Sequence, residues 1–397
     1  MSREQLVAMA KRNLAHARNN TVDLFDGVYR VPASNYFDEA RWRLEMGQVF
    51  KRVPLTLGFS AELPSPGDYK AMEVAGVPVL LSRGTDGAVR SFLNSCSHRG
   101  AIIVKEGTGH ARRFSCPYHA WTYNQEGDLV GILDRENFGE VDESCLGLTP
   151  LPVAERAGLI FGVLTPGFPM DIDTFLAGYD ELLEHLGFAN CRVVGSQSIA
   201  GPNWKVAYDG YVDLYHLPIL HRETFGPNMN NKAEYDAWGP HQRVTSPSRN
   251  AADTLADQPE DQWDIDRMTL GVWTIFPHVS IASFDAGGRV LMVSQLFPGA
   301  DVGSSVTVQT FLHTQPDAPG QAEDIERTMA FLNHVVADED YYTGLRIQKA
   351  LRTGAKKEVL FGRNEGGGQR FHQWVDAIIN TDDADLELLF KRGLEVS

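Results

Sequence analysis

The chain is short of cysteine, of basic residues and of long apolar runs. Four cysteines in 397 residues are too few for a disulfide scaffold, and this scarcity is typical of a reducing compartment, so we expect a cytoplasmic protein. Lys and Arg number 36 against 52 Asp and Glu, a net charge of −16 that argues against nucleic acid or an anionic membrane as the main partner. No segment approaches the roughly 18 apolar residues of a membrane span, and the N-terminus lacks the apolar core of a signal peptide. The G-x-G-x-x-G motif is absent too, so we expect no nicotinamide or flavin domain.

What is present is an ordinary globular composition, with 43% hydrophobic residues, over a length that suggests two or three domains. The pattern of apolar and turn-forming residues changes along the chain. We expect an N-terminal helical segment over residues 1–40, an all-β module with hairpins over 41–165, and a mixed α+β region over 166–397.

Periodicity predicts individual elements as well. Residues 39–53 have the pattern of an amphipathic helix, and 321–351 that of a long helix with acidic residues early and basic ones late. Residues 290–299 and 304–315 are typical of two antiparallel strands. The stretch 226–266 is polar, and we expect an exposed, mobile insertion that could close over a pocket.

Two cysteine–histidine pairs lie within the β module. Cys96-x-His98 is followed, after 17 residues, by Cys116-x-x-His119. Two thiolates and two imidazoles suit either a tetrahedral zinc ion or an iron–sulfur cluster in which two histidines replace two cysteines on one iron. Zinc sites usually pair like residues in each arm, whereas here each arm mixes one Cys with one His. That favours a cluster held between two hairpin loops.

These loops resemble those of a known family. FLNSCSHRGA and FSCPYHAWTYNQEGDL are similar to the two cluster-binding loops of a Rieske domain of the ring-hydroxylating oxygenase type. The resemblance implies that Cys96 and Cys116 bind one iron and that His98 and His119 bind the other. It covers nearly the whole chain, and it implies an α+β fold: an all-β Rieske domain plus a catalytic domain in which helices wrap an antiparallel sheet, the helix-grip arrangement.

A second metal-type motif is Asp213-x-x-His216-x-x-x-x-His221. Residues five apart lie about 140° apart around an ideal helix, so an undistorted helix would point the two imidazoles away from each other. Pro218 lies between them and can break or redirect the helix there. Taken alone, the pattern is better read as two unrelated histidines near a helix end. Its presence beside a Rieske signature reverses that preference.

The resemblance implies that His216 and His221, with one carboxylate, form the facial triad of a mononuclear non-haem Fe(II) site. The family places this carboxylate on the long C-terminal helix. We expect Asp340 to be the third ligand, with Asp338 and Glu339 as rivals.

The resemblance also gives Asp213 a role that is not metal binding. It implies a bridging carboxylate for electron transfer, hydrogen-bonded to His119 of a neighbouring subunit and to His216 of its own chain, as a carboxylate does when it fixes a metal-bound histidine. A bridge between chains implies a head-to-tail homotrimer, with or without a β subunit (α3 or α3β3).

The implied activity is that of a terminal oxygenase component. It would take electrons from a ferredoxin or flavin reductase and use O₂ to hydroxylate an aromatic or other apolar small molecule, with cis-dihydroxylation favoured. Mono-oxygenation or oxidative N- or O-demethylation on the same scaffold is the alternative. A non-enzymatic Rieske electron carrier and a zinc-binding interaction module are alternatives of other classes. A local basic face for an acidic ferredoxin could be formed by residues near the cluster loops, namely Arg99, Lys105, Arg112 and Arg113.

Overall fold

The computed structural model describes residues 2–246, 258–316 and 319–394, and the chain forms two compact units. The small unit comprises Phe50–Ile172 and Gly187–Arg192. The large unit comprises Met1–Val49, Asp173–Leu186 and Val193–Ser397. The domain boundaries expected at 40/41 and 165/166 stay predictions.

The small unit is built from three antiparallel sheets. The first has the order β10 (Pro150–Leu151), β5 (Val89–Leu93), β4 (Val77–Arg83), β3 (Asp68–Val74), β6 (Gly107–His110). The second has the order β11 (Val153–Arg156), β12 (Leu159–Gly162), β2 (Leu55–Phe59), and the third β7 (Arg113–Ser115), β8 (Thr122–Asn124), β9 (Leu129–Gly131). Its short helices are η3 (Ser60–Glu62), α3 (Arg135–Phe138), η4 (Glu143–Cys145) and η6 (Phe188–Asn190). Ala75 and Gly76 join β3 to β4 with positive φ at both positions, as a tight hairpin turn requires.

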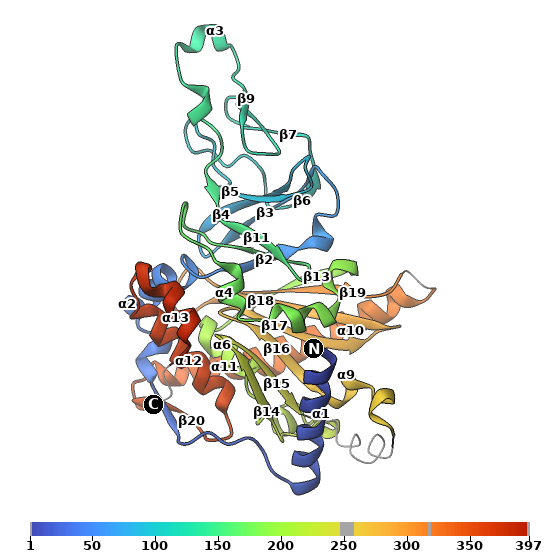
Figure 1. Ribbon diagram of the computed structural model, residues 1–397. Helices are drawn as coiled ribbons and strands as arrows, with labels where there is room; N and C mark the ends of the chain where they lie inside the picture. The colour runs from blue at the N-terminus through green and yellow to red at the C-terminus, as the bar shows by residue number, and fades with distance from the viewer. Residues whose placement is uncertain (1, 247–257, 317–318, 395–397) are drawn as a thin grey trace. The chain divides into compact units, whose positions relative to one another are not determined.

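The large unit is organised around one seven-stranded antiparallel sheet, visible as a continuous layer in Figure 1. Its order is β13 (Arg192–Gly201), β19 (Ser305–His313), β18 (Arg289–Pro298), β17 (Val279–Asp285), β16 (Leu270–Ile275), β15 (His241–Ser246), β14 (Glu234–Trp238). β18 and β19 are the two antiparallel strands expected at 290–299 and 304–315, and the structure confirms their pairing. A separate two-stranded sheet pairs β1 (Tyr29–Pro32) with β20 (Glu358–Phe361).

Helices surround this sheet. Those that precede β13 in the sequence are α1 (Ser2–Asn19), η1 (Ala33–Tyr36), α2 (Glu39–Glu45), η2 (Met46–Phe50), α4 (Ile172–Leu176), α5 (Asp180–Leu183) and η5 (Glu184–Leu186). Then come α6 (Trp204–Tyr211), α7 (Leu217–Leu220), η7 (Gly226–Asn228), η8 (Glu260–Gln262) and α9 (Ile265–Met268). The C-terminal part has α10 (Gln321–His334), η9 (Val335–Tyr341), α11 (Tyr342–Leu351), α12 (Gly366–Ile379), η10 (Asp383–Asp385) and α13 (Leu386–Arg392). Within residues 2–246, 258–316 and 319–394, none of the helices combines the length and the apolar character needed to cross a bilayer.

The expected long helix over 321–351 is helical throughout, but its centre is not α-helical. The segment η9 is a π-helix, in which each turn holds an extra residue. Such segments occur frequently at functional sites, because the wider turn redirects side chains that an α-helix would point elsewhere.

The expectation of an exposed insertion at 226–266 is wrong for its central part. β14 and β15 are strands of the seven-stranded sheet, and all six residues of β15 are buried. The reason is that β15 begins His-Gln-Arg, three polar residues whose side chains are buried with hydrogen-bond partners: Gln242 donates to the Gly367 carbonyl, for example. Polarity therefore did not mean exposure here. Residues 247–257 lie outside the described part of the chain.

Candidate metal centres

Two loops of the small unit share one backbone conformation. In each, the fourth residue after the cysteine donates its N–H to the cysteine carbonyl, Gly100 to Cys96 at 2.8 Å and Ala120 to Cys116 at 3.0 Å. Gly100 and Ala120 both adopt left-handed backbone angles, with φ of +75° and +56°. Each loop thus curls around its own cysteine, which accounts for the predicted pairing of one Cys and one His per loop.

The four predicted cluster residues, two thiols and two imidazoles, are linked through Trp121: both cysteines belong to the same buried core cluster as this ring, and His98 stacks on it. Cys96 and Cys116 are buried, and the half-buried rings of His98 and His119 lie 4.7 Å apart between centroids. His98 is stacked on Trp121 at 4.8 Å with the planes 10° apart. Desolvation and the nearby His119 lower the pKa of His98 below its ordinary value, so the ring is neutral, as a metal ligand must be. Its Nδ1 atom is buried without a protein partner, which fits an atom reserved for a metal.

A tyrosine that the sequence did not single out completes this site. The hydroxyl of Tyr123 lies 3.2 Å from Cys96 Sγ and accepts the backbone N–H of Ser97 at 3.0 Å. Burial and the contact with Cys96 raise the pKa of Tyr123, so it remains a phenol able to donate to sulfur. Only the fold could reveal this contact, because 27 residues separate the two side chains.

In the large unit, helix α6 is the platform for the second motif. It begins at a side-chain cap, where Asn203 Oδ1 accepts from the N–H of Lys205 at 2.9 Å, and it packs on β18 and β19. Trp204 Nε1 donates to Glu45 at 2.9 Å, and the buried ammonium of Lys205 pairs with the same carboxylate. These buried contacts hold the helix whose C-terminal end leads to Asp213.

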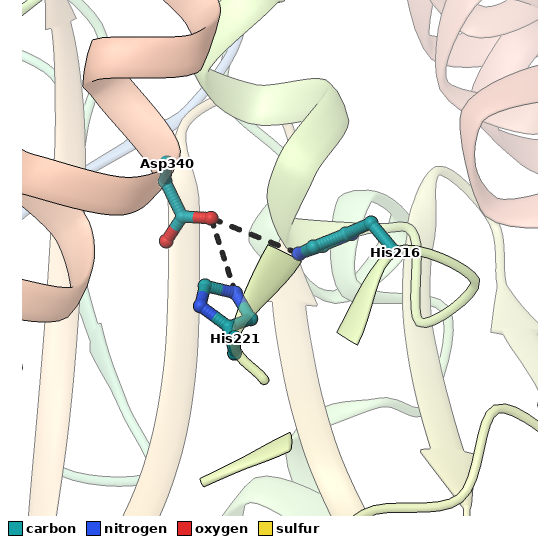
Figure 2. A group of neighbouring side chains, drawn as sticks. All are labelled: His216, His221 and Asp340. Atoms are coloured by element: carbon teal, nitrogen blue, oxygen red, sulfur yellow. Dashed lines mark ion pairs between the residues drawn. The ribbon is translucent and has the colours of Figure 1, made fainter. Parts of the chain in front are cut away.

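The chain bends between α6 and the four-residue helix α7, with His216 just before α7 and His221 just after it. The helix is interrupted at residues 212–216, and Pro218 is the second residue of α7, in the first turn, where a helix tolerates proline. The two imidazoles therefore converge: their Nε2 atoms lie 3.7 Å (His216) and 3.2 Å (His221) from the same oxygen of Asp340 (Figure 2). The three donor atoms lie within 4.8 Å of one another.

The rival carboxylates lie elsewhere. Glu339 Oε2 is 2.6 Å from Nδ1 of His221, the nitrogen on the far side of the ring, and accepts from the hydroxyl of Thr224 at 3.0 Å. Asp338 is 68% exposed and pairs with His334 at 2.8 Å. Burial opposes protonation of His221, but Asp340 and Glu339 together outweigh it and raise the pKa of this histidine above its ordinary value.

Asp213 contacts His216 on the side away from Asp340. Asp213 Oδ2 lies 3.1 Å from Nδ1 of His216, and Oδ1 accepts the backbone N–H of Tyr215 at 2.5 Å. Asp213, His216 and Asp340 also line one cavity of about 250 Å³. Asp213 thus contacts Nδ1 of His216, while Nε2 of the same ring faces Asp340.

Two imidazole nitrogens and one carboxylate oxygen on one side of an ion are the donor set of mononuclear non-haem iron sites. The residues present fit that ion. The outer partners fit as well, because each histidine meets a carboxylate at Nδ1, which leaves Nε2 available to a metal.

Comparisons with known proteins place a known domain over each of the two candidate sites. Residues 54–142 match the model of the Rieske [2Fe-2S] domain, and residues 188–381 match that of the ring hydroxylating alpha subunit (catalytic domain). The chain belongs to the Rieske ring-hydroxylating oxygenases. The family, the α+β fold and the pair of cofactor-binding domains predicted from the sequence are confirmed, since these two domains are those that carry the [2Fe-2S] cluster and the mononuclear iron.

Individual relatives place this Rieske oxygenase within the family. The chain is 32% identical over 228 residues to the glycine betaine monooxygenase oxygenase subunit of Chromohalobacter salexigens, covering 56% of this chain and 50% of that one. It is 27% identical over 366 residues to the salicylate 5-hydroxylase large oxygenase component of a Ralstonia species, covering 82% and 80%. The fold matches a crystal structure of the quaternary ammonium Rieske monooxygenase CntA, with a TM-score of 0.77, 20% identity and coverage of 92% and 98%. The matched region spans about half the length of the first curated relatives.

Proposed function

We propose that this chain is a terminal oxygenase component that uses O₂ and electrons from a ferredoxin or flavin reductase to hydroxylate an aromatic or other apolar small molecule. The observation that carries the proposal is the convergence of His216, His221 and Asp340 beside Asp213. An electron carrier would have no use for this second donor set.

In this proposal, His216, His221 and Asp340 hold Fe(II), and Cys96, His98, Cys116 and His119 hold the [2Fe-2S] cluster. The iron, when bound, supplies the open coordination positions at which O₂ is activated. The protein's own contribution is positional. Glu339 holds the ring of His221, and Asp213 holds that of His216, so that both Nε2 atoms face Asp340.

Asp213 is proposed as the electron bridge between His216 and His119 of a neighbouring chain in a head-to-tail trimer. Apolar side chains next to Asp213 support this assembly: Ile347 and Leu360 line the same cavity and are 47% and 53% exposed. In the small unit, Tyr118, beside His119, is 57% exposed. Exposed apolar surface around both ends of the proposed bridge is typical of an interface.

The proposed redox partner is an acidic ferredoxin or a reductase. Exposed basic side chains near the cluster loops support this choice, in a chain that is otherwise acidic: Arg99, Lys105, Arg112 and Arg113. Complementary charge would speed the encounter and make it sensitive to salt.

Mono-oxygenation is the second candidate, and the names of the first curated relatives favour it, since they are glycine betaine monooxygenase subunits. A substrate screen with aromatic acids, polycyclic compounds and quaternary amines, read as substrate-dependent electron consumption, would identify the class. Labelled dioxygen then separates the outcomes: one labelled oxygen in the product indicates mono-oxygenation, and two indicate dihydroxylation.

The decisive variant is Asp213→Ala. We expect three irons per chain and an unchanged cluster spectrum, with electron consumption reduced by about 100-fold or more, because the bridge is lost while both metals stay bound. Asp338→Ala, which removes an exposed carboxylate, is the control. Normal turnover in Asp213→Ala would remove the bridge, two irons per chain in the wild type would revive the electron carrier, and colourless protein with zinc would indicate an interaction module.

A further inference from the structure

Three polar side chains from distant parts of the large unit meet at one point. Tyr36, at the end of η1, donates its hydroxyl to Asp209 Oδ2 on α6 at 2.8 Å. His372, on α12, places Nε2 2.9 Å from Asp209 Oδ1 and 3.0 Å from the Tyr36 hydroxyl. Each oxygen of Asp209 therefore has its own partner. Tyr36 and His372 are both 1% exposed, so this triad is almost fully removed from bulk water.

The triad opens onto the cavity beside the candidate iron site. Tyr36 and Asp209 line the same cavity of about 250 Å³ as Asp213, His216 and Asp340. At about 30 Å³ per water, the cavity has room for about eight waters. A chain of water molecules there would join the carboxylate of Asp209 to the side of the site that His216 and Asp340 face.

The charged groups around Asp209 are one cation that is already paired and two further carboxylates. Lys205 lies one turn earlier on α6, but its ammonium pairs with Glu45, and both are fully buried. On the cavity side lie two more carboxylates, Asp213 and Glu365. Burial raises the pKa of Glu365. The hydrogen bond from the N–H of Gly362 opposes this rise, and the charges of Asp213 and Asp209 add to it.

The phenol of the triad stays protonated. Burial and the adjacent Asp209 raise the pKa of Tyr36 well above its ordinary value. Tyr36 therefore acts as a fixed donor that orients the carboxylate, and the other contact of Asp209 is His372 Nε2, at hydrogen-bond distance from Oδ1.

We propose that Tyr36, Asp209 and His372 form a proton-holding triad that takes up a proton when the neighbouring iron is reduced and releases it to the cavity when O₂ is consumed. The inference rests on the proposed oxygenase function. The triad would carry the protons of the reaction, and the bridge through Asp213 would carry its electrons.

The stoichiometry requires such a route. Mono-oxygenation converts R–H, O₂, two electrons and two protons into R–OH and water, and the electrons come from the ferredoxin or reductase. The protons come from solvent. One proton at a time moves from the pair of His372 and Asp209 to a cavity water and on to the reacting oxygen, and water in the cavity then returns a proton to the pair through Asp209, which lines it.

The test uses Asp209→Asn, which keeps the size of the side chain but removes its ability to hold the proton. Tyr235→Phe is the matched control, because it removes a hydroxyl that donates to the Asn364 carbonyl at 2.7 Å, away from the triad. Metal content and the cluster spectrum are measured first. The midpoint potential of the mononuclear iron is then followed by EPR at controlled potentials over a pH series, which needs iron but no substrate.

In the wild type and in Tyr235→Phe, we expect the potential to fall as pH rises, because reduction takes up a proton. In Asp209→Asn, the potential should no longer depend on pH. Product formation should fall about 100-fold, with hydrogen peroxide appearing instead, while the reduced cluster loses its electron within twofold of the wild-type rate. Tyr36→Phe should retain part of the pH dependence, since the carboxylate keeps His372.

An unchanged pH dependence of the potential in Asp209→Asn would overturn the triad, whatever the turnover. A wild-type protein that binds iron and shows the pH-dependent potential, yet hydroxylates nothing, would overturn the oxygenase function and leave the triad supported. The two failures are thus distinguishable.

Discussion

Glu339 and Asp340 lie against opposite nitrogens of one imidazole ring. Glu339 Oε2 is 2.6 Å from Nδ1 of His221, and Asp340 Oδ1 is 3.2 Å from its Nε2. Consecutive residues of an α-helix point about 100° apart, but here both reach the same ring from the π-helical segment η9. One residue thus orients the histidine, and the next belongs with it to the candidate metal site.

Removing the orienting carboxylate should weaken metal binding without abolishing it. For Glu339→Ala, we expect about 10- to 100-fold weaker iron binding, because the ring of His221 loses the partner that fixes its orientation and tautomer. Glu339→Gln should lose less, since the amide oxygen still accepts from Nδ1. Iron retained during dialysis against a graded chelator measures the effect, and Glu326→Gln, an exposed change on α10, is the control.

Substitutions of the neighbouring carboxylates of η9 should differ in their effect on the mononuclear iron. Asp340→Ala and His221→Ala are expected to lose the mononuclear iron and keep the cluster absorption, because only the large-unit site is damaged. Asp338→Ala should keep both, since that side chain is 68% exposed and pairs with His334, away from the donor atoms. Iron analysis with visible spectroscopy decides this. Loss of iron in Asp338→Ala with retention in Asp340→Ala would reverse the assignment.

Tyr123→Phe should lower the reduction potential of the cluster. The hydroxyl 3.2 Å from Cys96 Sγ stabilises the more negative, reduced state, and its removal takes that stabilisation away. A spectroscopic redox titration measures the change. The control is Tyr69→Phe, because Tyr69 lies in the same unit, with its ring against Phe114. Equal potentials in the two variants would show that the hydroxyl of Tyr123 does not influence the cluster.

A buried glutamate on β14 should make stability depend on pH. Burial, with Asp236, raises the pKa of Glu234 to about 9, although Arg12 Nη2 lies 2.9 Å away. The folded state then holds a proton that the unfolded state has lost, so the free energy of unfolding is highest at acidic pH and falls as pH rises through about 9. Glu234→Gln should remove this decline and stabilise the protein at alkaline pH by at least about 1 kcal/mol. Urea unfolding over a pH series tests it, with Glu260→Gln as control.

The proposed trimer should be sensitive to charge at its apolar face. Ile347 is 47% exposed on α11 and lines the cavity with Asp213, so Ile347→Asp should shift the protein toward monomers. Leu388→Asp introduces the same charge at a 55% exposed position on α13 that lines no part of this cavity. Sedimentation velocity at several concentrations compares them. Equal oligomeric states in both variants would show that assembly does not use this face.

Much of the molecule could be predicted from local patterns. The strands β18 and β19, the hairpin β3–β4 and the helical stretch at 321–351 follow from periodicity and turn residues. The metal-type residues were recognisable because Cys and His at such short spacing, repeated in two loops, are typical of metal sites. The predicted break at Pro218 lies instead at residues 212–216, and His216 and His221 converge from the two ends of the single turn α7.

What the sequence could not supply depends on contacts between distant segments. Tyr36 and Asp209 are 173 residues apart, and Asp209 and His372 are 163 apart, so no spacing relates them. The buried strand β15 was mistaken for a surface insertion because its polar side chains find their partners only in the folded chain, on segments distant in sequence such as α4 and α12. The π-helical turn of η9 was equally invisible, although it decides that Glu339 and Asp340, and not Asp338, reach His221.

That turn also makes η9 intolerant of changes in length. Deleting one residue between 335 and 341 would let an ordinary α-helix form, because a π-helical turn differs from an α-helical one by its extra residue. Helices α10 and α11 could then keep their packing, but the acids between them would point in new directions, and Glu339 and Asp340 would no longer meet the two nitrogens of His221. Natural variation and engineering in this segment should therefore exchange residues one for one, while insertions and deletions collect in the loops outside it.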